Sequence, residues 1–317
     1  MVHAFGRDER TVADWRDRGG QHSQQIHEAM VEQGQLDLMH VQADEIRGKG
    51  RTMVAWMGLA TMISTRRWLA GTVSQRRDKG LADALRQPVG RTARKRRPLL
   101  VLTDGWAAYP GRMCRAFREK VQTTPGPGRA CVQVGPPLHM GTIITRTEKK
   151  RVVDITRTMA RGLLEDAQFL LTRSGGGENL TTAFLERLHG TVRERLASLT
   201  RNSRHAASRL HALRTGRDLI GGTYHFGVVH QERSKEKPWG KHCPPAIASG
   251  RTDPAWSVGE WLWYKVAPTP WAAPTRRGPR PKHTAHHAGV VKQQHAFSRV
   301  RPLLRLRTGV FCSTTGS

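Results

Sequence analysis

Cysteine is scarce in this chain, and the few cysteines lie far apart. They never form a Cys-x-x-Cys pair, so a disulfide framework or a zinc ribbon has no support. Long apolar runs are lacking too, because the longest near-apolar run, residues 53–64, is well short of the roughly 18–20 residues that a membrane span needs. The first residues carry charges where a signal peptide needs an apolar stretch. We therefore expect a cytoplasmic protein with no membrane partner and with four reduced thiols, Cys114, Cys131, Cys243 and Cys312.

Acidic residues are also few, and none follows Glu260. The 317 residues include 53 Lys and Arg against 25 Asp and Glu, which gives a formal net charge of +28. Such self-repulsion is costly unless a polyanion neutralises it, and nucleic acid is the obvious polyanion. The pattern of residues 268–317 predicts a basic, disordered C-terminal extension that binds phosphates non-specifically. Its predicted DNA contacts are Arg276, Arg277, Arg280 and Lys282.

Apolar runs in the middle of the chain predict an α/β fold. Residues 38–46, 53–63 and 68–73 are closely spaced strand patterns, which suits an antiparallel meander. Residues 75–86 predict a helix that ends before Pro88, and the continuous apolar run of residues 99–104 is typical of a buried parallel strand. Together they predict a β-meander followed by a β-α-β crossover. Further expected elements are short strands over residues 130–134 and 151–155, a helix with one apolar stripe over residues 180–199, and a basic helix over residues 204–213.

The N-terminal segment predicts a short amphipathic helix over residues 6–18, with Val12 and Trp15 as its apolar seam. Its polar face suits the recognition helix of a helix-turn-helix motif, although the preceding helix of such a motif is missing. An ordinary solvated helix is the alternative, and composition alone favours neither. The predicted DNA contacts on this segment are Arg7, Arg10 and Thr11.

Three acidic residues stand at places where an unpaired charge is expensive. Asp44 lies within the first predicted strand, Asp104 ends the buried strand, and Glu186 lies in the long helix. Phosphodiester cleavage and strand transfer use two divalent ions about 3.5–4 Å apart, which carboxylates hold well because Mg²⁺ prefers oxygen ligands. Each acid alone is also compatible with a strand-end cap or a solvated position, but the three together favour a two-metal site.

The sequence around each of these acids resembles a block of the bacterial insertion-sequence DDE transposases. The blocks are residues 41–46, 102–110 and 182–193, of which the second carries the fairly specific Asp-Gly-Trp-x-x-Tyr pattern. The later stretches Tyr224-His225-Phe226, 244–250 and 256–260 resemble the C-terminal part of that family. The resemblance covers roughly residues 5 to 271.

The resemblance implies an RNase H-like core, with a mixed five-stranded sheet and flanking helices, that cleaves double-stranded DNA at transposon ends and joins it to target DNA. Asp44, Asp104 and Glu186 would hold Mg²⁺ or Mn²⁺, in an enzyme that acts on nucleoid DNA as a homo-oligomer. The implied organisation is a partial helix-turn-helix in residues 1–35, the catalytic core in 36–200, a helical and aromatic part in 201–267, and the basic extension in 268–317. Arg187, His189 and Arg193 are further predicted DNA contacts.

Two positions depart from the family pattern, which has asparagine where this chain has His189 and His225. The N-terminal motif also matches only the second helix of a family-type helix-turn-helix. These departures motivate an alternative of a different class, a decayed or co-opted transposase that only binds DNA. A generic basic RNA-binding protein would explain the charge, but it would leave the three carboxylates and the Asp-Gly-Trp-x-x-Tyr block unexplained.

Overall fold

The computed structural model describes residues 6–32, 35–49, 53–121, 131–135, 138–149, 151–196, 199, 210–230 and 243–267. The chain divides into two compact units, residues 1–267 and 268–317, and the second lies outside the described residues. The predicted contacts Arg276, Arg277, Arg280 and Lys282 therefore lie outside them as well. No helix in the described part of the chain is both long and apolar enough to cross a membrane.

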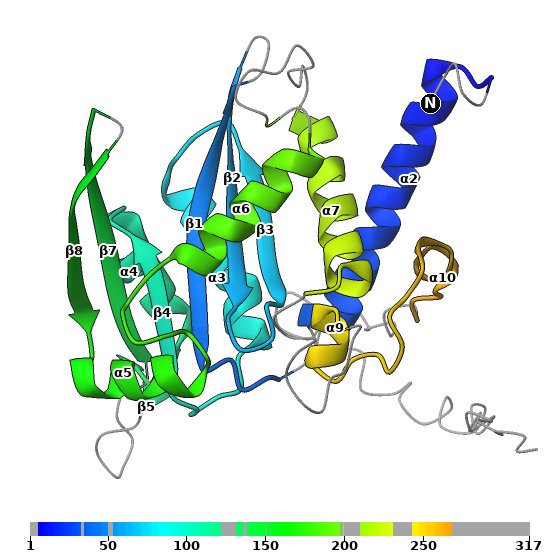
Figure 1. The fold of residues 1–317 in the computed structure, drawn as a ribbon. Helices are drawn as coiled ribbons and strands as arrows, with labels where there is room; N and C mark the ends of the chain where they lie inside the picture. The colour runs from blue at the N-terminus through cyan, green and yellow to red at the C-terminus, as the bar shows by residue number, and fades with distance from the viewer. Residues whose placement is uncertain are drawn as a thin grey trace, which may run out of the picture. The chain divides into compact units, whose positions relative to one another are not determined.

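A six-stranded mixed sheet lies at the centre of the fold, with the strand order β3-β2-β1-β4-β7-β8 (Figure 1). The first three strands form the expected antiparallel meander, β4 pairs parallel to β1, β7 pairs parallel to β4, and β8 returns antiparallel to β7. The predicted α/β class with a mixed sheet and flanking helices is therefore confirmed. The strands are β1 (His40–Lys49), β2 (Val54–Met62), β3 (Trp68–Ser74), β4 (Leu99–Asp104), β7 (Leu138–Glu148) and β8 (Arg151–Arg161).

The resemblance implied a five-stranded sheet, which is one strand too few, since the central sheet has six strands. The sequence pattern did not predict β7. The strand predicted over residues 130–134 does exist, but as β6 (Cys131–Val134) it pairs with β5 (Arg118–Val121) in a separate two-stranded sheet. The strand predicted over residues 151–155 continues to Arg161, because its pairing with β7 supplies hydrogen bonds along its whole length.

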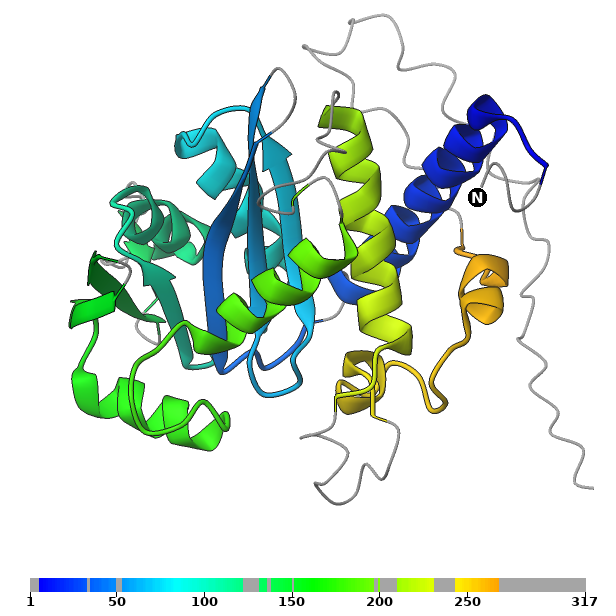
Figure 2. The same ribbon diagram turned by 45° about the horizontal axis from the view of Figure 1, so that its top comes forward.

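Helices cover both faces of the central sheet. Helices α3 (Lys79–Thr92) and α4 (Ala108–Ala116) cover one face. The other face carries α5 (Leu164–Arg173), α6 (Ala183–Arg195) and α7 (Leu210–Gly227). Figure 2 shows α6 crossing the strands, with α7 beside it. The C-terminal part adds the short helices α9 (Pro245–Ala248) and α10 (Val258–Trp263).

Apolar residues alternate along β1 and so supply both cores. Val41 and Ala43 pack against α3 and α4, whereas Ile46 packs against α6 and α7. Burial of a valine or isoleucine side chain contributes about 1.5–3 kcal/mol relative to its exposure. Successive residues of a strand face opposite ways, so Gln42 and Asp44 lie on the same face as Ile46, the face that carries α6.

Helix α3 continues through Pro88, contrary to the expectation that it ends before this residue. A proline inside a helix removes one backbone hydrogen bond and crowds the preceding turn. The buried face of the helix compensates, because Leu81, Leu85 and Val89 are all in the core beneath the sheet.

The N-terminal helix α2 (Glu9–His27) is longer than predicted and leads into the short π-helix η1 (Glu28–Glu32). It packs along α7, and the two helices are so close that a Cβ on Gly20 would lie 2.5 Å from Thr215 Cγ2. The predicted seam of Val12 and Trp15 was wrong, since Trp15 is 53% exposed. The buried residues of α2 come later, at Gly20, Ser23 and Ile26, because only the C-terminal half of α2 is covered.

The later helices also depart from their predicted bounds. The helix expected over residues 180–199 is shorter, since α6 covers only Ala183–Arg195, although Leu185, Leu188 and Val192 are buried as predicted. Of the basic helix expected over residues 204–213, residues 204–209 lie outside the described residues. The aromatic block at residues 224–226 is the last turn of α7.

Candidate active site

The pairing of β1 with β4 places Asp44 beside Asp104. These parallel strands match Val41 with Val101 and Ala43 with Thr103. The next position on each strand is therefore an aspartate, Asp44 on β1 and Asp104 at the end of β4. Side chains at matched positions of neighbouring parallel strands point to the same face, so both carboxylates lie on the face that carries α6.

Gln42 holds the start of α6 over this face. Its Nε2 donates to the Thr181 carbonyl at 2.6 Å, and its Oε1 accepts from the Leu185 backbone N–H at 3.0 Å. The side chain of Gln42 is buried, so both bonds are shielded from water. Gln42 was not predicted as a site residue, although a polar residue between Val41 and Ala43 in a buried strand was a usable signal.

Glu45 joins the two aspartates in one acidic cluster. One carboxylate oxygen from each of Asp44, Glu45 and Asp104 lies within 4.8 Å of the others. Glu45 belongs to the opposite face of β1, but β4 ends at Asp104 and leaves room at the edge of the sheet. Glu45 was not predicted as a site residue, although a second acid directly after Asp44 in a largely buried strand was a usable signal.

Arg77, in the loop after β3, binds two carboxylates of this cluster. Its guanidinium pairs with Glu45, and its Nη2 donates to Asp104 Oδ2 at 2.7 Å. The same guanidinium lies 5.3 Å from the centre of the Trp56 ring and 4.8 Å from that of Trp106. Cation–π contact and ion pairing therefore hold Arg77 in place even though it lies at the surface.

Burial and mutual repulsion raise the pKa values of the carboxyl groups in this cluster. Burial, and next the negative charge of Asp104, raise the pKa of Asp44 to about 8. Burial also raises the pKa of Asp104, although the Trp106 N–H and the Arg77 guanidinium oppose the rise. The pKa of Glu45 is raised for the same first reason. Carboxylates with too little compensating charge are typical of a cation site.

Glu186 lies on α6, beyond the 4.8 Å cluster but within its electrostatic reach. The negative charge of Glu186 contributes to the raised pKa of Asp44. The carboxylate of Glu186 is exposed and accepts a hydrogen bond from Thr182 Oγ1 at 3.1 Å. The structure thus brings Asp44 and Asp104 together and places Glu186 near Asp44.

His189 stands one helical turn after Glu186, with its ring against Asp44. Its Nδ1 lies 3.8 Å from Asp44 Oδ2, and the residue is only 4% exposed. Burial, helped by the Arg193 charge, lowers the pKa of His189 to about 3, so the ring is neutral at ordinary pH. Contact of His189 with DNA stays a prediction, although the ring is buried and adjoins the Asp44 carboxylate.

His225, the other position that departs from the family pattern, lies in a different place. It is buried in the last turn of α7, with its ring centre 4.8 Å from that of Phe226. Burial, together with the Arg67 charge, lowers the pKa of His225 well below its usual value. Its surroundings are those of a core residue.

The remaining predicted DNA contacts lie on two helices. Arg187 is exposed on α6 next to Glu186, and Arg193 is half-buried further along the same helix. Arg7 is exposed just before α2, Arg10 is exposed in the first turn of α2, and Thr11 donates its backbone N–H to the Asp8 cap at 2.7 Å. The structure holds no DNA, so contact with DNA stays a prediction for all four arginines and for Thr11.

We expect Tyr109→Phe to lower the free energy of unfolding by about 1–2 kcal/mol, because it leaves a buried carboxylate with one hydrogen bond fewer. Tyr109 is fully buried, and its hydroxyl donates to Glu45 Oε2 at 2.8 Å. Urea unfolding measures the change. Tyr264→Phe is the matched control, since no described residue accepts a hydrogen bond from that hydroxyl. Equal stability of the two variants would mean that the bond to Glu45 contributes nothing.

The donor set of the site is all oxygen, which suits a hard divalent cation such as Mg²⁺. Asp44 and Asp104 can share one ion from the same face of the sheet, and the negative charge of Glu186 also reaches Asp44. In comparisons with known proteins, no protein-family model and no curated protein matches this chain.

Proposed function

We propose that this protein is a DDE transposase that cleaves DNA strands at transposon ends and joins them to target DNA. The observation that carries the proposal is the register of β1 and β4, which sets Asp44 and Asp104 side by side beneath the helix that bears Glu186. The proposal includes an RNase H-like core. Its support is the antiparallel β1–β3 meander followed by β4 and β7 parallel to β1.

Asp44, Asp104 and Glu186 would hold Mg²⁺ or Mn²⁺ in this proposal. A pair of such ions supplies activation of the attacking oxygen and stabilisation of the leaving oxygen. The raised pKa of Asp44 supports the assignment, because a divalent ion would relieve the repulsion that causes part of it. The protein itself fixes the ligands: His189 adjoins Asp44, the Trp106 N–H donates to Asp104, and Gln42 anchors α6.

Double-stranded DNA is the proposed substrate, and the net charge of +28 supports a polyanionic partner. Arg187 and Arg193 on α6 are proposed phosphate contacts beside the scissile bond. Arg7, just before α2, and Arg10 and Thr11 in its first turn belong to the proposed remnant of a helix-turn-helix motif that reads transposon ends. As an enzyme that holds two ends together, the protein would work as a homo-oligomer on DNA.

Cleavage of a supercoiled plasmid tests the proposal. The plasmid carries the ends of the DNA element that encodes the chain, and the expected products are nicked and linear DNA in Mg²⁺ or Mn²⁺ but not in EDTA. Filter binding of the same plasmid ends runs in parallel. A folded protein that binds these ends and leaves them intact in every divalent ion would overturn the proposal.

The same pair of assays tests the alternative function, a protein that binds DNA without cleaving it. One structural observation favours this alternative: Arg77 already pairs with Glu45 and Asp104 and so supplies a positive charge to the cluster. An active enzyme would need Arg77 to share these carboxylates with a metal ion. Binding without cleavage in the wild type would select the alternative.

A further inference from the structure

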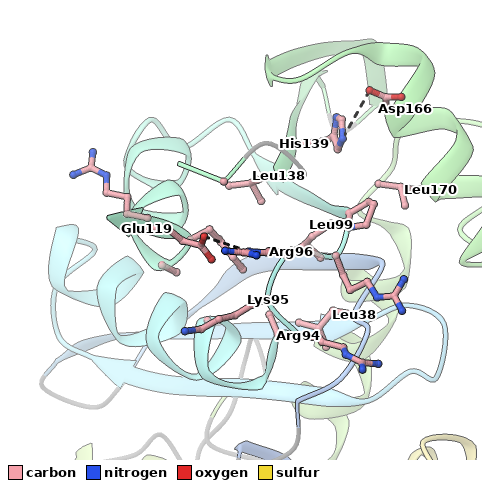
Figure 3. A pocket seen from close by; sticks show the side chains of 18 of the residues that line it. Leu38, Arg94, Lys95, Arg96, Leu99, Glu119, Leu138, His139, Asp166 and Leu170 are labelled. Carbon is pink, nitrogen blue, oxygen red and sulfur yellow. Dashed lines mark ion pairs between the residues drawn. The ribbon is translucent and has the colours of Figure 1, made fainter. Parts of the chain in front are cut away.

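A large cavity lies at the end of the sheet opposite the acidic cluster. Its volume is about 1170 Å³, and it opens between the segment before β4, the α4–β5 junction, the start of β7 and helix α5 (Figure 3). Strand β4 connects the two places, since Leu99 lines the cavity and Asp104 belongs to the acidic cluster. At about 3.3 Å per residue, the two sites are roughly 17 Å apart.

The inner wall of the cavity is apolar. Leu38, Leu99, Leu138 and Leu170 line it from four different segments, as Figure 3 shows. Phe169 on α5 also lines it, although this ring is 62% exposed. An exposed ring at the mouth of an apolar cavity gives a flat partner a surface on which to stack.

The rim of the cavity is strongly basic. Six cations line it against two carboxylates, Glu119 and Asp166. The ion pairs on the rim are weak, because Arg96 lies 4.0 Å from Glu119 and is 86% exposed, and Arg97 lies 4.0 Å from Asp37. Exposed pairs at such distances contribute little, so most of the positive charge is available to a ligand. The six cations are Arg94, Lys95, Arg96, Arg97, Arg118 and Lys120.

We propose that this cavity binds unpaired nucleotides of a single DNA strand, with bases against the apolar wall and phosphates on Arg94, Arg96 and Arg97. Proteins that bind single strands combine a basic groove with aromatic rings on which bases stack. The volume exceeds the roughly 300–1000 Å³ of a pocket for one drug-sized molecule, so there is room for more than one base. A duplex keeps its bases stacked inside and offers the apolar wall nothing to bind.

This site is separate from the proposed chemistry at Asp44 and Asp104. Binding to it is expected in EDTA and in a protein that cleaves nothing. A strand opened near the carboxylates would be held at this second point by the same molecule. The site therefore predicts a preference for DNA that has an unpaired segment next to a duplex.

The charge of the rim is tested by Arg94→Gln/Arg96→Gln/Arg97→Gln in the full chain, with fluorescence anisotropy of a short labelled single strand in EDTA. We expect Kd to rise about tenfold or more, and the slope of log Kd against log salt to fall by about 2, since each lost phosphate contact on a single strand removes about 0.7. Arg18→Gln/Arg146→Gln/Arg151→Gln is the matched control, because these exposed arginines lie outside the cavity and the same charge is lost. Equal effects of the two triple variants would overturn the proposal.

Phe169→Ser tests the base contact without a change of charge. Stacking of one base is worth about 1–3 kcal/mol, so Kd for the single strand is expected to rise at least about fivefold at an unchanged salt slope. Kd for a duplex of the same sequence is expected to stay the same. Trp263→Ser is the control, since this ring is 83% exposed on α10 and does not line the cavity. A loss of affinity shared equally by duplex and single strand, or no loss at all, would refute the base contact and with it the proposal.

Discussion

Asp104→Asn is expected to lower the rate of Mg²⁺-dependent DNA cleavage about 1000-fold, which corresponds to roughly 4 kcal/mol of lost transition-state stabilisation. The amide keeps the shape of the side chain and its bond from the Trp106 N–H, but it removes the negative charge at the end of β4. Asp44→Asn and Glu186→Gln are expected to lower the cleavage rate in the same way, because each removes one proposed metal ligand. Single-turnover cleavage of the end-bearing plasmid measures the rates.

Asp154→Asn is the control for this loss, because Asp154 is an exposed carboxylate on β8, outside the acidic cluster. The affinity for the plasmid ends in EDTA should be the same for Asp104→Asn and for the wild type. The loss of rate would then come from the cleavage step and not from weaker DNA binding. Cleavage by Asp104→Asn at the rate of the control variant would show that this carboxylate holds no catalytic ion.

Asp44→Asn is expected to stabilise the metal-free protein by about 2–4 kcal/mol at pH 8. Burial and the Asp104 charge raise the pKa of Asp44 from 3.8 to about 8, so the folded state holds a proton that the unfolded state releases. The stabilising effect of this proton is fully present below the unfolded pKa and is lost as pH rises through about 8. Urea unfolding of both proteins between pH 5 and pH 8 should therefore show a gap that widens with pH.

A divalent ion should reverse this order of stability. Mg²⁺ that binds only the folded state raises the wild-type unfolding temperature with its concentration. Asp44→Asn should respond much less, while Asp154→Asn should behave as the wild type does. If Asp44→Asn proved less stable than the wild type at every pH in EDTA, the carboxylate would be satisfied by its neighbours and the cluster would need no cation.

The strands that bear the two aspartates were predictable because apolar residues recur along both of them. Residues 38–46 and 99–104 bury nearly every side chain, so their patterns reflect the core itself. The crossover helix between them also carries its apolar residues on one face. Asp44 and Glu45 are adjacent acids in the first run, and Asp104 ends the second. The resemblance of the surrounding blocks to DDE transposases singled out Asp44 and Asp104.

Strand β7 was not predictable from its own residues, since its last five residues are exposed and show no clean alternation. Its first residues are buried by β4 and α5, which are neighbours in space but distant in sequence. Glu45 and Arg77 were not predicted as site residues, because their position also depends on neighbours that are distant in sequence. Their pairing depends on the end of β4 and on two tryptophans from different elements, Trp56 and Trp106, and no local pattern contains that information.

The close register of β1 and β4 also limits how the length of this chain can change. A one-residue deletion between His40 and Ala43 would turn Asp44 toward α3 and α4 and would put Glu45 in its place beside Asp104, because adjacent residues of a strand face opposite ways. Spacing within these four residues of β1 is therefore as strict a requirement of the site as the aspartates themselves.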